Sequence, residues 1–211
     1  MDYEKHQLDL LNVTIQTNTI ATPDLIASYQ PYAVILATGA QPVRPDAIPG
    51  IHLPTVYTLD QVLSGAVVLK NKKVALIGSG SSGLETAEFL CENGNRLTFV
   101  EMQETIGKGV YVQHYLDAMD KLKPYTIRNL PFHQLKEIRE NEIVLENLAT
   151  RQIETCPTDA VVLAVGVKPV QTLLKACESI CPKTFIIGDA AHPGRIESAV
   201  RTAFETAYAL K

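Results

Sequence analysis

The sequence predicts an α/β protein built on a parallel sheet, with a small antiparallel meander. Short, continuous apolar runs alternate along the chain with segments of helical periodicity, a pattern typical of parallel sheets covered by helices. One apolar run leads directly into a glycine-rich segment, residues 78–83, which leads in turn into a helical segment. Residues 132–155 change to short, partly alternating segments, which is the pattern of antiparallel strands.

The first part of the chain predicts a helix end at residues 3–11 and a short strand at residues 13–15. Residues 32–37 form a continuous apolar run that stops at Thr38-Gly39, as expected of a strand buried on both faces. The following segment contains Pro42, Pro45, Pro49 and Pro54. Its composition predicts an ordered connector or a domain boundary.

A second unit begins near Lys72. Residues 74–77 predict a buried strand, and residues 81–93 predict a helix because their apolar positions recur at helical spacing and Gly94 follows as a C-cap. Residues 97–100 predict the next strand, which ends on Glu101. A helix near residues 110–122 and a strand near residues 125–127 continue the alternation.

The later elements begin with the meander, which is expected at residues 132–138, 142–147 and 151–155. Residues 160–165 predict a further buried strand that ends at Gly166. Residues 184–187 predict a strand followed by Gly188-Asp189, and residues 196–210 predict the last helix.

Composition and charge narrow the class of partner. The net charge of −4 shows no basic excess, which argues against nucleic acid or an anionic membrane as the main partner. The apolar runs are too short to span a bilayer, and the first residues lack the order of a signal peptide, so we expect a cytoplasmic protein. The four cysteines and five histidines show no zinc-like spacing, and we predict no metal site.

The loop Gly78-Ser79-Gly80-Ser81-Ser82-Gly83 has the GxGxxG spacing of a Rossmann dinucleotide site. The first glycine permits a tight turn, the second allows close approach of a pyrophosphate, and the third allows the helix to pack near the sheet. The helix N-terminus then offers N–H groups to the phosphates. The loop has the required strand before it and helix after it, so we predict a Rossmann-like unit that binds NAD(H) on these six residues.

Glu101 lies 18 residues beyond Gly83, at the end of the next strand. An acid at this position is expected to accept the adenosine ribose hydroxyls and to repel a 2′-phosphate, which favours NADH over NADPH. A methyltransferase that binds S-adenosylmethionine also uses a glycine loop and a strand-end acid, but the third glycine and the meander favour the dinucleotide site.

Three separated motifs carry a family resemblance: residues 34–39 with Pro42, the glycine loop through Glu101, and residues 185–190. Together they resemble the two-dinucleotide flavoprotein reductases of the pyridine nucleotide-disulfide oxidoreductase-like superfamily. Residues 83–90, Glu101-Met102 and Ile106-Gly107 are similar to the C-terminal portion of NADH:flavin oxidoreductases related to 2-enoate reductase, 2,4-dienoyl-CoA reductase and trimethylamine dehydrogenase. The resemblance covers nearly the whole chain.

The resemblance implies that the Rossmann unit is inserted in an FAD-binding domain. Residues 1–62 and 184–211 would then belong to the FAD-binding domain, and residues 63–183 to the NAD(H)-binding domain. It further implies that the flavin-side residues are Ala37, Thr38, Gly39, Gly188 and Asp189, and that Gly166 closes the NAD(H) domain.

The sequence also departs from this family. No second GxGxxG loop precedes Tyr32, so the FAD-binding domain is expected to be incomplete, with a missing N-terminal portion of the parent enzyme as a partner. An unpaired sheet edge would also favour a homodimer. Two functions remain open: part of an enzyme that passes hydride from NADH to FAD, or a non-catalytic NAD-binding module or redox sensor without flavin.

Overall fold

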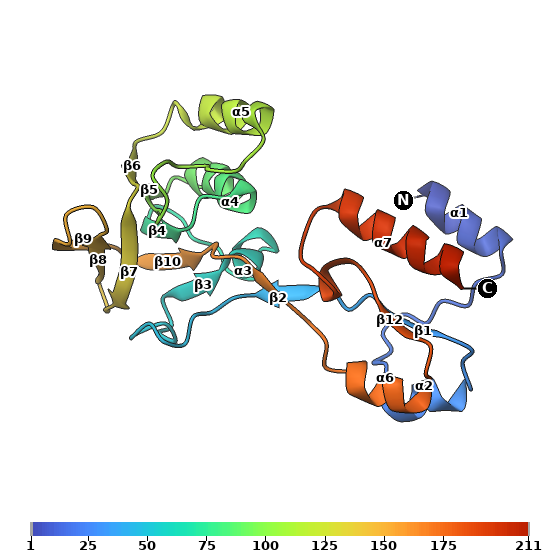
Figure 1. The fold of residues 1–211 in the computed structure, drawn as a ribbon. Helices are drawn as coiled ribbons and strands as arrows, with labels where there is room; N and C mark the ends of the chain where they lie inside the picture. The colour runs from blue at the N-terminus through green and yellow to red at the C-terminus, as the bar shows by residue number, and fades with distance from the viewer. Residues whose placement is uncertain (1, 211) are drawn as a thin grey trace. The chain divides into compact units, whose positions relative to one another are not determined.

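The computed structural model describes residues 2–210, which form two compact units (Figure 1). Unit 1 joins the residues up to Gly39 with those from Pro169 onward, and unit 2 is the continuous segment Ala40–Lys168. Unit 2 is therefore inserted in the chain of unit 1. Among the described residues, no helix is both long enough and apolar enough to cross a bilayer.

The central sheet of unit 2 has five parallel strands in the order β3-β10-β4-β5-β6. Each pair of chain neighbours from β4 to β6 is connected through a helix, as parallel pairing requires. The strands are β3 (Val56–Thr58), β10 (Ala160–Leu163), β4 (Lys73–Ile77), β5 (Arg96–Val100) and β6 (Ile127–Leu130).

Both faces of this sheet are covered, which explains why its central strands β10 and β4 are mostly apolar. On one face, Val74, Leu76 and Phe99 pack with the helices that lie over them. These helices are α3 (Leu59–Leu63), α4 (Ser81–Glu92) and α5 (Val112–Leu122). On the other face, Ala75 and Val100 pack against the meander.

The meander is a three-stranded antiparallel sheet in the order β7-β8-β9. Its strands are β7 (His133–Ile138), β8 (Glu142–Asn147) and β9 (Ile153–Pro157). Ile143 and Leu145 of β8 are fully buried against the parallel sheet. The structure confirms the parallel sheet and the meander expected from the sequence.

Unit 1 contains a two-stranded parallel sheet made from distant parts of the chain. Strand β1 (Val34–Leu36) pairs with β12 (Thr184–Ile186). Helices α2 (Pro23–Ser28) and α6 (Leu174–Ile180) bury the small core around this pair, which includes Leu36, Cys177 and Cys181. Helix α1 (Asp2–Leu10), the 3₁₀ turn η1 (Gly188–Ala190) and helix α7 (Ile196–Ala209) complete the unit.

The strand predicted at residues 13–15 is absent, so this expectation is wrong. Val13 is 47% exposed and Ile15 58% exposed, and no neighbouring strand pairs with them among the described residues. Three alternating residues do not form a strand without a partner. The proline-rich segment, by contrast, contains β2 (Ala40–Pro42), which pairs with β11 (Val167–Pro169), and then β3; none of these three strands was anticipated.

The division of the chain differs from the expected boundaries at 62/63 and 183/184. Residues 40–62 belong to unit 2 because Ile51 and Val56 are buried in its core. Helix α6 belongs to unit 1 because Cys177 is fully buried beside β1. The apolar contacts made by each connecting segment therefore decide its unit.

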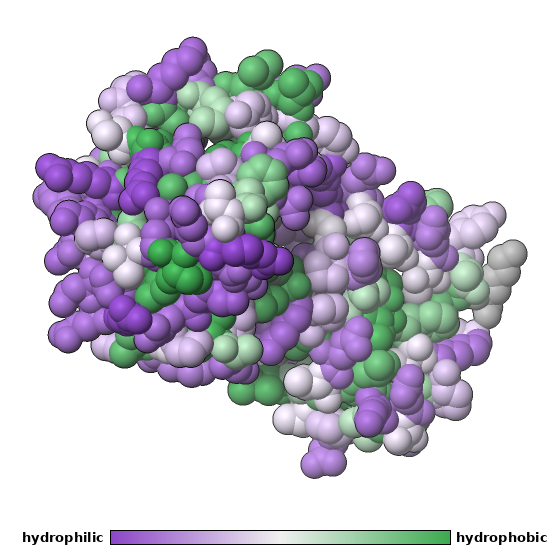
Figure 2. Space-filling model, turned by 60° about the vertical axis from the view of Figure 1, so that its left-hand side comes forward, coloured by the Kyte–Doolittle hydropathy of each residue, from purple (hydrophilic) through white to green (hydrophobic). Residues whose placement is uncertain are grey.

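Helix α7 leaves an apolar stripe uncovered within unit 1. Its large apolar residues recur every four positions and are 63–84% exposed: Ile196, Val200, Phe204 and Tyr208. Phe204 and Tyr208 stack on one another with ring centroids 6.0 Å apart. Figure 2 shows apolar residues at the surface of unit 1, whereas polar side chains cover most of the meander end of unit 2.

Candidate functional site

The glycine loop connects the carboxyl end of β4 to the amino end of α4. Gly78 has a φ of +97°, and a Cβ there would lie 2.4 Å from the carbonyl oxygen of Ala164. A Cβ on Gly83 would lie 2.6 Å from the carbonyl oxygen of Gly78. These separations are too short for carbon and oxygen, so the close packing of the loop, α4 and β10 itself requires glycine at both positions.

Gly80 is different. Its φ of −64° is accessible to any residue, and a Cβ there would have no atom within 4 Å. Nothing in the described part of the protein therefore requires glycine at this position. A ligand that approaches the backbone closely does require it, and this is the role that the sequence assigned to Gly80.

The amino end of α4 has no side-chain cap. Gly80 is the N-cap, and the hydrogen-bond ladder of the helix starts with Leu84 N donating to Gly80 O. Ser81 and Ser82 are exposed in the first turn. Helix N-termini of this kind present N–H groups and the positive end of the helix dipole to phosphates.

Ser79 holds the loop in place and does not face solvent, since it is only 1% exposed. Its hydroxyl donates to Glu101 Oε2 at 2.7 Å and accepts from Gly107 N at 3.0 Å. Its backbone N–H donates to the same carboxylate oxygen at 2.9 Å. Ser79, which was expected to contact the cofactor, thus connects the loop after β4 with two points of the loop after β5.

Glu101 has a corresponding structural role. Besides Ser79, it binds Gln103 through Oε1, which accepts from the Gln103 backbone N–H at 2.9 Å. The carboxylate therefore connects the loop after β4 with the loop after β5. Sequence reasoning anticipated its position at the strand end and missed these contacts.

A cleft of about 590 Å³ opens over this arrangement, entirely within unit 2. The glycine loop and Glu101 form one part of its lining, and apolar side chains form most of the rest. The lining residues are Pro45, Ala47, Ile48, Ile77, Gly78, Ser79, Gly80, Val100, Glu101, Met102, Gln103, His133, Gln134, Leu135, Ala164 and Val165. Gly166, with a φ of +93°, directly follows Val165 and accepts a hydrogen bond from Val43 N.

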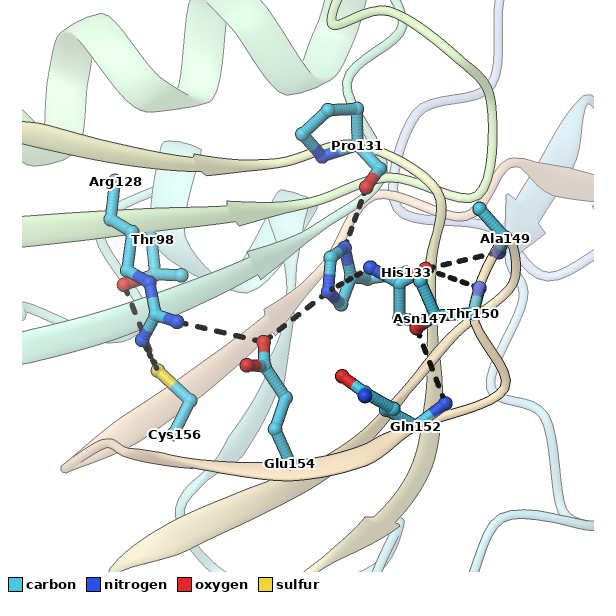
Figure 3. Close-up of polar contacts among 10 residues, drawn as sticks. All are labelled: Thr98, Arg128, Pro131, His133, Asn147, Ala149, Thr150, Gln152, Glu154 and Cys156. Carbon is cyan, nitrogen blue, oxygen red and sulfur yellow. Dashed lines mark hydrogen bonds and ion pairs between the residues drawn. The ribbon is translucent and has the colours of Figure 1, made fainter.

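His133 lies in one wall of the cleft and belongs to a polar cluster formed by residues of β6 and the meander (Figure 3). His133 is 7% exposed, with Nδ1 2.5 Å from Pro131 O and Nε2 3.3 Å from Glu154 Oε1. Arg128 places one guanidinium nitrogen 3.5 Å from the same Glu154 oxygen and another 3.7 Å from Cys156 Sγ. These contacts fix His133 as a packed residue of the wall.

The flavin-side residues of the sequence analysis gather in unit 1. Ala37, Thr38 and Gly39 follow β1, and Gly188 and Asp189 follow β12. Since β1 and β12 are parallel and in register, the two segments leave the same edge of the sheet, where ligands of parallel sheets bind.

Two polar side chains at that edge make local contacts. Asp189 Oδ1 accepts from Gly194 N at 3.0 Å, which orders the turn before α7. Thr38 donates from Oγ1 to Val170 O. Both residues remain accessible, Thr38 exposed and Asp189 half-buried, so they retain room for a ligand.

The cysteines do not form a reactive pair. All four are free and buried, and burial raises the pKa of the Cys91 thiol to about 11. Burial also raises the pKa of the Cys177 thiol. Neither is a thiolate at neutral pH, so neither is a nucleophile there. The described residues contain no group of three His, Cys, Asp or Glu side chains that could hold a metal.

A model of the pyridine nucleotide-disulphide oxidoreductase family matches residues 12–206. The chain is 31% identical to an NADH oxidase from Thermoanaerobacter brockii over 98% of this chain and 32% of that protein. It is 30% identical to a bilirubin reductase from Mediterraneibacter gnavus over 89% of this chain and 28% of that protein.

Among solved structures, a 2-naphthoyl-CoA reductase in complex with 2-naphthoyl-CoA has a similar fold, with a TM-score of 0.87 and 29% identity. The match covers 97% of this chain and 31% of the reductase. The chain thus spans about a third of the length of these relatives.

Proposed function

Because the chain belongs to the pyridine nucleotide-disulphide oxidoreductase family, whose cofactors are NAD(H) and FAD, we propose that its unit 2 binds NADH for a flavin-dependent oxidoreductase. NADH donates hydride and flavin accepts it, and the protein contributes binding and orientation.

The observation that carries the proposal is Gly80. The packing of the protein accounts for Gly78 and Gly83, but not for a glycine at position 80, where a side chain would project into open space. A pyrophosphate lying across the loop accounts for it. The adjoining cleft of about 590 Å³ has the size of a cofactor site.

For the flavin, unit 1 offers Thr38 and Asp189 at the shared edge of β1 and β12. These residues fit a polar part of FAD, such as its ribityl chain or pyrophosphate.

The first test is nucleotide preference. The unmodified chain is expected to bind NADH more tightly than NADPH, because the Glu101 carboxylate accepts ribose hydroxyls and repels a 2′-phosphate. Glu101→Ala is expected to weaken NADH binding by about 1–3 kcal/mol and to narrow the preference. Fluorescence titration with both nucleotides measures this, and equal affinities in the unmodified chain would contradict it.

Two controls separate recognition from structure, because Glu101 also connects the loops through Ser79 and Gln103. Glu101→Gln keeps an acceptor for Ser79 and removes the charge. It is therefore expected to be more stable than Glu101→Ala and to show the same narrowed preference for NADH over NADPH. Glu104→Ala removes a nearby carboxylate that pairs with Lys108 at the surface, and it is expected to change neither property.

The second candidate function, an NAD-binding module without flavin, is favoured by the single GxGxxG loop of this sequence. Without a second loop to bind the FAD pyrophosphate, we expect the chain alone to purify without tightly bound FAD and to oxidise NADH negligibly. Visible absorbance after gel filtration measures this. Stoichiometric flavin on the chain would overturn the expectation and support a complete flavin site.

A further inference from the structure

The opposite edge of the unit 2 sheet carries a cluster of basic residues. Lys73 is the first residue of β4 and Arg96 the first residue of β5, so both lie at the amino edge, away from the glycine loop. Lys73 and Arg96 are direct partners in the strand register, as are Thr98 and Arg128. Because register partners share a face of a sheet, all four side chains project from the face that carries the meander.

These residues line a groove of about 280 Å³. Leu97, Thr126, Cys156 and Pro157 complete the lining, and none of the lining residues is shared with the dinucleotide cleft. In the described part of the chain, the lining includes three cations and neither an acidic nor an aromatic side chain. The groove is therefore suited to a small anion and offers no surface on which a base could stack.

Within the described structure, Lys73 and Arg96 are not neutralised by neighbouring carboxylates. Like charges directly opposite each other on neighbouring strands repel, and Lys73 faces Arg96 in this way. Among residues 2–210, neither of these two side chains lies within ion-pair distance of a carboxylate. Some other cations of unit 2, such as Lys121, Lys136 and Arg139, do pair with at least one carboxylate.

Two carboxylates lie at the margins of the cluster, but both are already engaged. Asp159, in an adjoining hollow, accepts the backbone N–H of Lys73 at 2.7 Å through Oδ2. One carboxylate oxygen of Glu154, Oε1, lies within ion-pair distance of both Arg128 and His133. The same contact, together with that to Cys156, orients the Arg128 guanidinium on the wall of the groove (Figure 3).

We propose that this groove binds the phosphate group of inorganic phosphate or of a small phosphomonoester, with Lys73, Arg96 and Arg128 as its ligands. Two guanidinium groups and an ammonium match the charge and the hydrogen-bonding oxygens of a phosphate dianion. The bound anion would relieve the repulsion between Lys73 and Arg96.

Inorganic phosphate and glycerol 3-phosphate, titrated into the intact chain at constant ionic strength, test the proposal by calorimetry. Both are expected to bind, and tighter binding of the ester identifies an organic phosphate as the better ligand. Arg96→Gln and Lys73→Gln are each expected to weaken binding by about tenfold or more. Lys108→Gln, which removes an exposed charge that pairs with Glu104 outside the groove, is the control and is expected to leave binding unchanged.

A second measurement distinguishes this site from the glycine loop, which also attracts phosphate. Gly80→Val is expected to remove any phosphate bound at the loop and to leave phosphate binding at the groove intact, because the groove shares no lining residue with the cleft. Arg96→Gln is expected to raise stability without phosphate and to lose the stabilisation that phosphate adds. Binding that survives Arg96→Gln but not Gly80→Val, or no saturable binding at all, would overturn the proposal.

Discussion

Gly80→Val is expected to lose NADH binding by about 100-fold or more while the protein stays folded. The branched side chain would project into the space over the loop, where nothing of the described protein lies and where the pyrophosphate is proposed to bind. The backbone at Gly80 has a φ of −64°, so valine introduces no left-handed strain. Poorer N-capping by valine costs about 1 kcal/mol, too little to unfold a domain.

Fluorescence titration with NADH measures the loss, and urea unfolding followed by circular dichroism verifies the fold. Gly80→Ala is the matched variant with a smaller side chain, and we expect it to lose less affinity. If folded Gly80→Val binds NADH normally, the dinucleotide does not lie on this loop.

Gly83→Ala is expected to have the opposite profile, with a loss of stability of about 3 kcal/mol. Helix propensity alone predicts a gain of about 1 kcal/mol when alanine replaces glycine within a helix. The structure reverses the sign, because the new Cβ would lie 2.6 Å from the backbone oxygen of Gly78 and part of the loop would have to move. The free energy of unfolding from urea titration decides between the two signs.

Gly80→Ala in the same loop is the control for Gly83→Ala, since its Cβ meets nothing within 4 Å. It is expected to unfold at nearly the urea concentration of the unmodified chain. A stabilised Gly83→Ala variant would mean that α4 does not pack tightly on the loop.

The sequence was informative wherever one local pattern determines structure. Buried parallel strands such as β4 and β5 are apolar at most positions after their first residue, because both faces of the sheet are covered there. The glycine loop was predicted from its GxGxxG spacing between a strand and a helix, and close packing accounts for two of its glycines, Gly78 and Gly83. The family predicted from these motifs is confirmed by the match over residues 12–206.

Other features depend on contacts between distant residues, and the local sequence does not encode them. The connection of Ser79 to Gly107 joins loops 28 positions apart. Strand β3 lies in the proline-rich segment and forms because Val56 pairs with Val161 of β10. Residues 13–15 show the converse, since a local alternation without a partner strand remains irregular.

The basic groove is another feature that depends on residues far apart in the sequence. Lys73, Arg96 and Arg128 are scattered along the chain, and a net charge of −4 conceals them in the composition. They come together only because β4, β5 and β6 are neighbours in the sheet.

The insertion of unit 2 between β1 and β12 has a consequence for the order of folding. These two strands pair although they lie about 150 positions apart, and closing a flexible loop of that length costs about 4 kcal/mol in chain entropy. Folding of unit 2 removes most of this cost, because β2 pairs with β11 and brings the two crossing segments together, with Val170 N donating to Gly39 O at 2.9 Å. We therefore expect unit 2 to fold first and the discontinuous unit 1 to close afterwards. A cavity made in the core of unit 2 is expected to destabilise both units, and a cavity made in unit 1 is expected to leave unit 2 folded.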